Sequence, residues 1–187
     1  MLARLAVFTI IGLAAPAQAE VQKFMNMCGG DAQSLRLCPS YALVMTLPDG
    51  WIEDKAATRE HKVQIVVPKG ETYASAPALI YVKVSLRNKE QPLADFIRVS
   101  EERWKESVPD SVVTRLPEVE RANARAAFAP YRYDNPSTPQ QAAEIVSFGI
   151  DSDRDGNEFV LMVVVTAREK KALDRADGAY KAFLRAN

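Results

Sequence analysis

Apolar and polar residues alternate along much of this chain, which is the spacing of half-buried β-strands. The clearest case is Ala78–Leu86, where Ile80, Val82 and Val84 fall on one face of the predicted strand. Such alternation indicates a sheet that has at least one buried side. Further extended segments are expected at residues 41–46, 51–52, 61–67, 111–118, 124–133 and 143–150.

Two segments have the spacing of amphipathic helices. In residues 92–105 the apolar side chains recur at helical intervals from Leu93 to Trp104, and charged residues fill the opposite face. Pro92 suits the first turn of such a helix. A second apolar stripe, which includes Tyr180, predicts a final helix over residues 169–187.

Residues 159–166 form the strongest predicted strand because both of their faces are apolar. Leu161 and Val163 lie on one face and Val160 and Val164 on the other. A strand of this kind needs cover on both sides of its sheet, and the two predicted helices can supply it. The expected fold class is therefore α+β: a three-layer α/β/α sandwich with a mostly antiparallel sheet of about six or seven strands.

The first nineteen residues have the pattern of an export signal. Arg4 provides a positive start, residues 5–13 an apolar run, and Ala17 and Ala19 the small residues of a cleavage site. We expect a mature protein that begins at Glu20 and is periplasmic or secreted, without stable membrane insertion after cleavage; an uncleaved N-terminal anchor is the alternative. The expected organisation is a signal peptide (1–19), an irregular segment (20–40) and a single α+β domain (41–187).

The net charge and the distribution of charged residues limit the classes of partner that we expect. The 24 basic and 24 acidic residues cancel and are scattered singly along the chain. Surfaces that hold nucleic acid or anionic lipid concentrate Lys and Arg instead. The composition therefore argues against nucleic acid and leaves an unidentified protein or small ligand as the expected partner.

Cys28 and Cys38 are the only cysteines in the sequence. In an oxidising compartment an isolated pair of this kind is typically a disulfide, and closing so short a loop stabilises a fold by about 3 kcal/mol. We expect the bridge to tie the irregular segment to the domain. A redox pair is the alternative, but redox-active thiols usually lie two residues apart at the start of a helix.

Several motifs follow one another in a characteristic order. They are Leu47-Pro48-Asp49-Gly50-Trp51, then Val66-Val67-Pro68-Lys69-Gly70, the helix with Trp104, Phe159-Val160-Leu161 and the helix with Tyr180. This order of elements resembles the PsbP-like α/β/α sandwich superfamily, which includes an extrinsic protein of the photosynthetic oxygen-evolving complex, a Ran-binding nuclear import factor and many bacterial exported proteins. The resemblance implies a binding or assembly factor and not an enzyme, and no functional residue is carried over from it.

One short motif has the spacing of a calcium loop. Asp151, Asp153 and Asp155 alternate, and Gly156 permits a sharp turn. The match fails at the twelfth position, where Met162 replaces the bidentate glutamate of an EF-hand. The motif predicts either a calcium site, the one cofactor that the sequence suggests, or a polar hairpin turn between two strands.

His61 is the single histidine and the one candidate general base. Asp54 and Glu53 could orient it if a hairpin brought them near. A surface histidine at the start of a strand is the competing interpretation. The sequence contains neither the Gly-x-Ser-x-Gly elbow of a serine hydrolase nor a glycine-rich phosphate loop.

These features lead to three hypotheses of function. The first is an exported, non-enzymatic binding or accessory protein that contacts a protein or small ligand through residues 69–77 and 131–139. The alternatives are a calcium-stabilised module that uses the Asp151 loop and a hydrolase built around His61. The aromatic side chains that could line a groove are Trp51, Trp104, Tyr73, Tyr81, Tyr131 and Tyr133, with Trp104 expected in the core.

Overall fold

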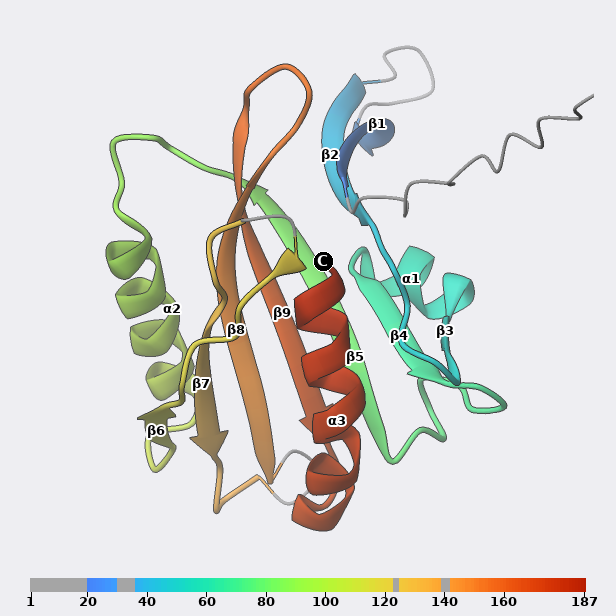
Figure 1. Cartoon of the computed structure of the whole chain (residues 1–187), viewed down its shortest axis with the longest axis vertical. Helices are drawn as coiled ribbons and strands as arrows, with labels where there is room; N and C mark the ends of the chain where they lie inside the picture. The colour runs from blue at the N-terminus through green and yellow to red at the C-terminus, as the bar shows by residue number, and fades with distance from the viewer. Residues whose placement is uncertain (1–19, 30–35, 123–124, 139–141) are drawn as a thin grey trace, which may run out of the picture.

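The computed structural model describes residues 20–29, 36–122, 125–138 and 142–187. Within them the chain forms a seven-stranded antiparallel sheet, a separate two-stranded hairpin and three helices (Figure 1). The elements are β1 (Glu20–Gly29), β2 (Arg36–Val44), β3 (Trp51–Glu53), α1 (Lys55–His61), β4 (Gln64–Pro68), β5 (Ala78–Leu86), α2 (Leu93–Ser107), β6 (Val112–Arg115), β7 (Ala129–Asp134), β8 (Ala143–Ser152), β9 (Glu158–Ala167) and α3 (Lys170–Ala186).

The large sheet has the strand order β3-β4-β5-β9-β8-β7-β6, and each neighbouring pair is antiparallel. The predicted α+β class and the antiparallel sheet are therefore confirmed. Strand β9 lies at the centre and pairs along its whole length with β5 on one side and β8 on the other. In the described residues no helix is long and apolar enough to cross a bilayer.

The two faces of β9 belong to different parts of the core. Leu161 and Val163 pack in a cluster that includes Leu173 and Leu184 of α3. Val160 and Val164 pack in a second cluster with Ile97 of α2. The same division is visible in Figure 1, where α3 crosses β9 and β5 and α2 lies beside β7 and β8. The apolar character of both faces of this strand thus corresponds to burial on both faces.

Two expectations about the early chain are wrong. The segment 20–40 was expected to be irregular, but β1 and β2 form a regular hairpin, which we call the arm. Residues 61–67 were expected to be one strand that starts at His61, but His61 is the last residue of α1. The alternating pattern made the predicted strand extend backwards into α1. This helix of seven residues buries only Ala57, so it has no apolar stripe that would mark it as a helix.

Local hydrogen bonds explain why α1 begins and ends where it does. The Asp54 carboxylate accepts from the backbone N–H groups of Ala56 and Ala57, which caps the first turn. Lys62 then adopts a left-handed conformation at φ 55° and ends the helix. The chain can therefore enter β4 at Gln64.

The base of the arm is attached to the sheet. Val21 and Leu43 are buried in the cluster that also contains α3, and Tyr41 stacks on Phe159 with ring centroids 4.7 Å apart. Beyond this base the arm leaves the body of the molecule (Figure 1). Its far end exposes apolar side chains, namely Phe24, Met25, Met27 and Leu37.

Candidate functional site

A groove of about 590 Å³ opens over β5 and the end of β9, and we call it the Tyr81 groove. Leu79 and Tyr81 come from β5 and Thr166 from β9. Tyr73 comes from the loop before β5 and Thr138 from the loop after β7. The structure thus brings together parts of the two segments, 69–77 and 131–139, that the sequence suggested as contact surfaces; Pro139 itself lies outside the described residues.

Hydrogen bonds hold the loop before β5 in place on one side of this groove. The Asp54 carboxylate that caps α1 also accepts from the Tyr73 N–H, at 3.0 Å. These backbone hydrogen bonds lower the pKa of Asp54 below its ordinary value, with that from Ala57 the largest contribution. Thr72 and Ser75 bond to each other within the loop. These hydrogen bonds therefore fix the loop as one wall of the groove.

Arg168 contributes the positive charge of the groove. Its backbone N–H donates to the Pro77 carbonyl at 3.2 Å, and its guanidinium donates to the Ala74 carbonyl. The first contact fixes the backbone of Arg168 and the second holds its side chain against the loop before β5. Among the described residues that line the groove, Arg168 is the one with a formal charge. An anionic group on a ligand would find its counter-charge here.

The floor of the groove carries a phenol that stays protonated. Burial raises the pKa of Tyr81, and the nearby negative charge of Glu144 raises it further. Glu144 is 1% exposed and pairs with Thr166 of β9, which in turn pairs with Leu79 of β5. A neutral phenol both donates and accepts hydrogen bonds, so Tyr81 can hold a polar ligand atom.

The other predicted aromatic residues are structural. Trp104 packs edge-on against Tyr133 with centroids 5.9 Å apart, in the cluster beneath α2. Tyr131 meets Phe148 in the same way. Tyr133 is therefore a contact between sheet and helix, and Tyr131 packs against the same cluster beneath α2. Trp51 packs against the cluster that contains α3.

The structure does not gather the three aspartates of the predicted calcium loop. The Asp151 carboxylate makes two ionic contacts. Its Oδ2 lies 2.8 Å from an Nη of Arg121 and 3.2 Å from an Nη of Arg125. Asp153 instead bonds its own turn and accepts from Asn157. In the part of the chain that the structure describes, no three His, Cys, Asp or Glu side chains are grouped as metal ligands. Residues 153–157 make the turn between β8 and β9, in which Gly156 has φ +79°.

Among the described residues, none with a carboxylate is shown paired with His61. It is exposed at the end of α1 and packs against Tyr73 with the rings tilted and their centroids 4.5 Å apart. Glu53 accepts a hydrogen bond from Thr58, and Asp54 caps the helix. Neither is bonded to the imidazole. The structure therefore places His61 beside one wall of the Tyr81 groove as an aromatic neighbour of Tyr73.

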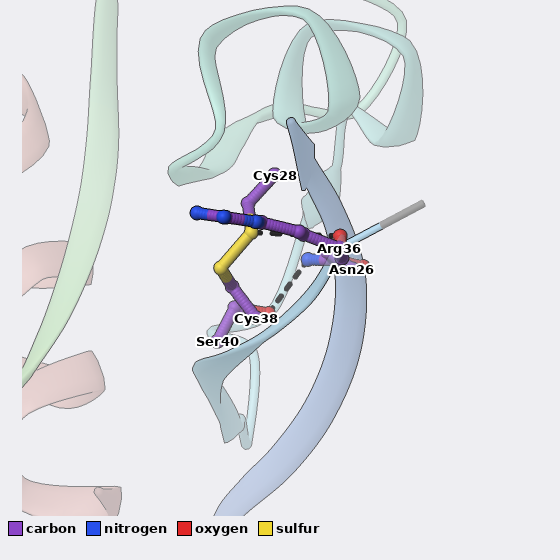
Figure 2. The surroundings of a disulfide bond; sticks show 5 residues. All are labelled: Asn26, Cys28, Arg36, Cys38 and Ser40. Atoms are coloured by element: carbon purple, nitrogen blue, oxygen red, sulfur yellow. Dashed lines mark hydrogen bonds between the residues drawn. A yellow bond between two sulfur atoms is a disulfide. The ribbon is translucent and has the colours of Figure 1, made fainter. Parts of the chain in front are cut away.

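Cys28 and Cys38 form the predicted disulfide, with Cα atoms 5.6 Å apart. The bridge lies across the arm (Figure 2), where Asn26 donates to the Ser40 hydroxyl at 2.6 Å. The Cys28 sulfur lies 3.5 Å from the Arg36 carbonyl oxygen. The disulfide joins the two strands of the arm, and it does not join an irregular segment to the domain as expected.

Two residues of the site were missed in the sequence. Arg168 lies two residues after the strongest predicted strand and resembled an ordinary surface charge. Glu144 gave a usable signal, because a single carboxylate within the otherwise apolar strand 143–150 marks a buried charge that needs an explanation. No family model matches this sequence, and a search of curated proteins finds no match for it.

Proposed function

We propose that this chain is an exported, non-enzymatic binding protein, and that the Tyr81 groove holds a small ligand with an apolar body and an anionic group. The observation that carries the proposal is the position of Arg168, held by the loop before β5 in a groove that apolar side chains such as Leu79 also line. Ligand pockets typically combine such apolar side chains with a few fixed polar groups.

The polar groups of the groove favour binding over turnover. Tyr81 is kept neutral by its raised pKa, which makes it a hydrogen-bond donor and a poor proton acceptor at neutral pH. Thr138 and Thr166 supply hydroxyl groups. Arg168 supplies a charge that does not titrate in the physiological range. These groups orient a ligand without activating it.

Separate observations support the proposed export and the proposed three-layer arrangement. Export is supported by the pattern of residues 1–19 and by a disulfide, which persists in oxidising compartments. A three-layer α/β/α arrangement of the PsbP-like kind is supported by the packing of α2 and α3 against opposite faces of β9. Calcium is a less favoured proposal, because Arg121 and Arg125 already neutralise Asp151.

The test is a calorimetric titration with octanoate as the probe, with octanol and octylammonium for comparison. We expect octanoate to bind and the two analogues to bind at least about tenfold more weakly, because the ion pair to Arg168 is a charge-assisted contact. Arg168→Gln removes the charge and leaves an uncharged polar side chain, so it should weaken octanoate about tenfold.

Arg175→Gln is the matched control. Arg175 lies on the exposed side of α3, outside the groove, and its replacement should leave octanoate affinity unchanged. Equal binding of octanoate and octanol, or equal loss in both variants, would contradict the proposal.

A further inference from the structure

A second groove, of about 840 Å³, lies between the arm, the end of α1 and one end of β5, and we call it the arm groove. It is separate from the Tyr81 groove and has no lining residue in common with it. The arm contributes Phe24 and the disulfide, α1 contributes Arg59, and β5 contributes Val82 to Val84. Figure 1 shows that β5 runs on beyond the start of β4.

The edge of β5 in this groove has no hydrogen-bonded partner strand. Strand β4 pairs with β5 only as far as Gln64 opposite Val82, so within the described chain no strand is hydrogen-bonded to residues 83–86 on that side, although β2 packs close by. The groove is the space that a longer β4 would fill, but Val63 and Lys62 turn away into α1.

The direction of the backbone groups follows from the alternation of an antiparallel ladder. The Ile65 N–H donates to the Thr58 hydroxyl and its carbonyl accepts from Asp54, so both groups point away from β5. Gln64 therefore directs its backbone groups at Val82. Two positions further on, Val84 directs its N–H and carbonyl at the groove, and Leu86 continues the pattern.

The opposite wall of the groove is the outer edge of β2, whose backbone groups can also form hydrogen bonds. The side-chain amide of Gln64 accepts from the Leu43 N–H at 2.7 Å and donates to the Leu43 carbonyl at 2.8 Å. A side chain thus occupies the outer edge of β2 as a strand would. Beyond Leu43, the outward-facing groups of Tyr41 come next along that edge. The groove is bounded by two strand edges, one of which is already bonded in a β-like way.

The charges of the arm groove have one sign. Arg59, Lys62 and Lys83 line it, all three are exposed, and no Asp or Glu lines it in the described chain. The remaining walls are largely apolar, with Val82, Val84 and Phe24. We propose that the arm groove binds an extended acidic peptide segment of a partner protein, which adds as a strand to this edge of β5. Main-chain bonds to a sheet edge give such peptides affinity, and alternate side chains give specificity.

The test uses a labelled capped peptide of three Glu-Val repeats, which presents acids on one face and valines on the other. Binding is measured by fluorescence anisotropy on the full mature chain. The same peptide with alternate amides N-methylated cannot bond the strand edge, so its affinity should fall at least about tenfold. A Lys-Val peptide of the same length should not bind.

Two lysine variants test whether peptide affinity depends on the positive charge of the arm groove itself. Lys83→Gln should weaken the Glu-Val peptide about threefold to tenfold, whereas Lys105→Gln, on the exposed side of α2, should have no effect. In the complex the amide protons of Val84 and Leu86 should exchange more slowly with solvent. Octanoate should not compete, so this result is independent of the proposal for the Tyr81 groove.

Three outcomes would overturn the inference. Binding that is indifferent to N-methylation would mean a charge contact without strand addition. Protection of Val84 and Leu86 that rises with protein concentration in the absence of peptide would mean that a second copy of this chain fills the groove. No measurable binding of the Glu-Val peptide to a protein with an unchanged melting curve would remove the site.

Discussion

The side chain of Gln64 bonds both backbone groups of Leu43, at 2.7 and 2.8 Å. This pair joins the first residue of β4 to the arm, which is also held by the apolar contacts of Val21 and Tyr41 and by the ion pair between Glu20 and Arg154. An amide is the one common side chain of this length that can both donate and accept there. Part of the attachment of the arm therefore comes from one side chain whose position in the sequence resembles that of any strand residue.

Gln64→Glu should loosen the arm, because the variant keeps an acceptor for the Leu43 N–H but loses the donor to the Leu43 carbonyl. We expect a loss of about 1–3 kcal/mol in the free energy of unfolding and faster amide exchange in β2. Gln22→Glu makes the same change on an exposed arm position and should cost less than about 0.5 kcal/mol. Denaturant unfolding and hydrogen exchange measure both, and equal effects would contradict this account.

Gly149 should not tolerate alanine, because an added Cβ would lie 2.6 Å from the ring of Phe128. Phe128 is fully buried and cannot move aside easily. Gly149→Ala should therefore cost about 1–3 kcal/mol. In α3, Gly178 has nothing within 4 Å of the added atom, so Gly178→Ala should stabilise the protein by about 0.4–1 kcal/mol. Thermal melts of the two variants should shift in opposite directions, and a shift in the same direction would show that the packing is misassigned.

Buried tyrosines should make the fold sensitive to alkaline pH. Burial raises the pKa of Tyr81, Tyr133 and Tyr180 in the folded state. In the unfolded chain they ionise near pH 10, so their contribution is complete below that pH and is lost as the pH rises above it. As the pH rises above about 10, each of these tyrosines should lower the free energy of unfolding by about 1.4 kcal/mol per pH unit.

Tyr180→Phe provides the control for this pH dependence. The Tyr180 hydroxyl lies 2.7 Å from the Ser147 hydroxyl and donates to the Val163 carbonyl at 2.8 Å. Its removal should cost about 1–3 kcal/mol at pH 7 and make the alkaline fall in stability less steep. An unchanged slope between pH 10 and 11 would mean that Tyr180 ionises freely in the folded protein.

The ion pairs of Asp151 should be structural. Arg121 is inaccessible in its side chain, so Asp151→Asn would leave a buried positive charge without its carboxylate and cost about 3 kcal/mol. Asp155→Asn changes an exposed carboxylate in the turn that follows β8 and should cost less than about 0.5 kcal/mol. Both are measured in chelator. Millimolar calcium should not move the melting temperature of the unaltered protein, and a rise with calcium would revive the calcium proposal.

Sequence patterns were sufficient where burial repeats along an element. β5 occupies the predicted residues, and β9 and α3 begin and end within about two residues of expectation, because apolar side chains recur along each of them. The start of β4 was misplaced because α1 is fixed by the cap that Asp54 provides, and a short helix without an apolar stripe has no periodic signal.

The candidate site was only half visible in the sequence. Both contact segments could be named because loops with small and polar residues are recognisable as such. Arg168 could not be assigned to them, since its place beside the Ala74 carbonyl follows from the pairing of β5 with β9. Strand order of this kind is a long-range property that no local pattern encodes.

The most direct test of the binding proposal is where octanoate protects the protein from hydrogen exchange. The account predicts slower exchange in residues 73–79 and 166–168 of the unaltered protein at saturating octanoate, and no such change in Arg168→Gln at the same concentration. Protection elsewhere, or equal protection in the variant, would contradict the assignment of the Tyr81 groove as the ligand site.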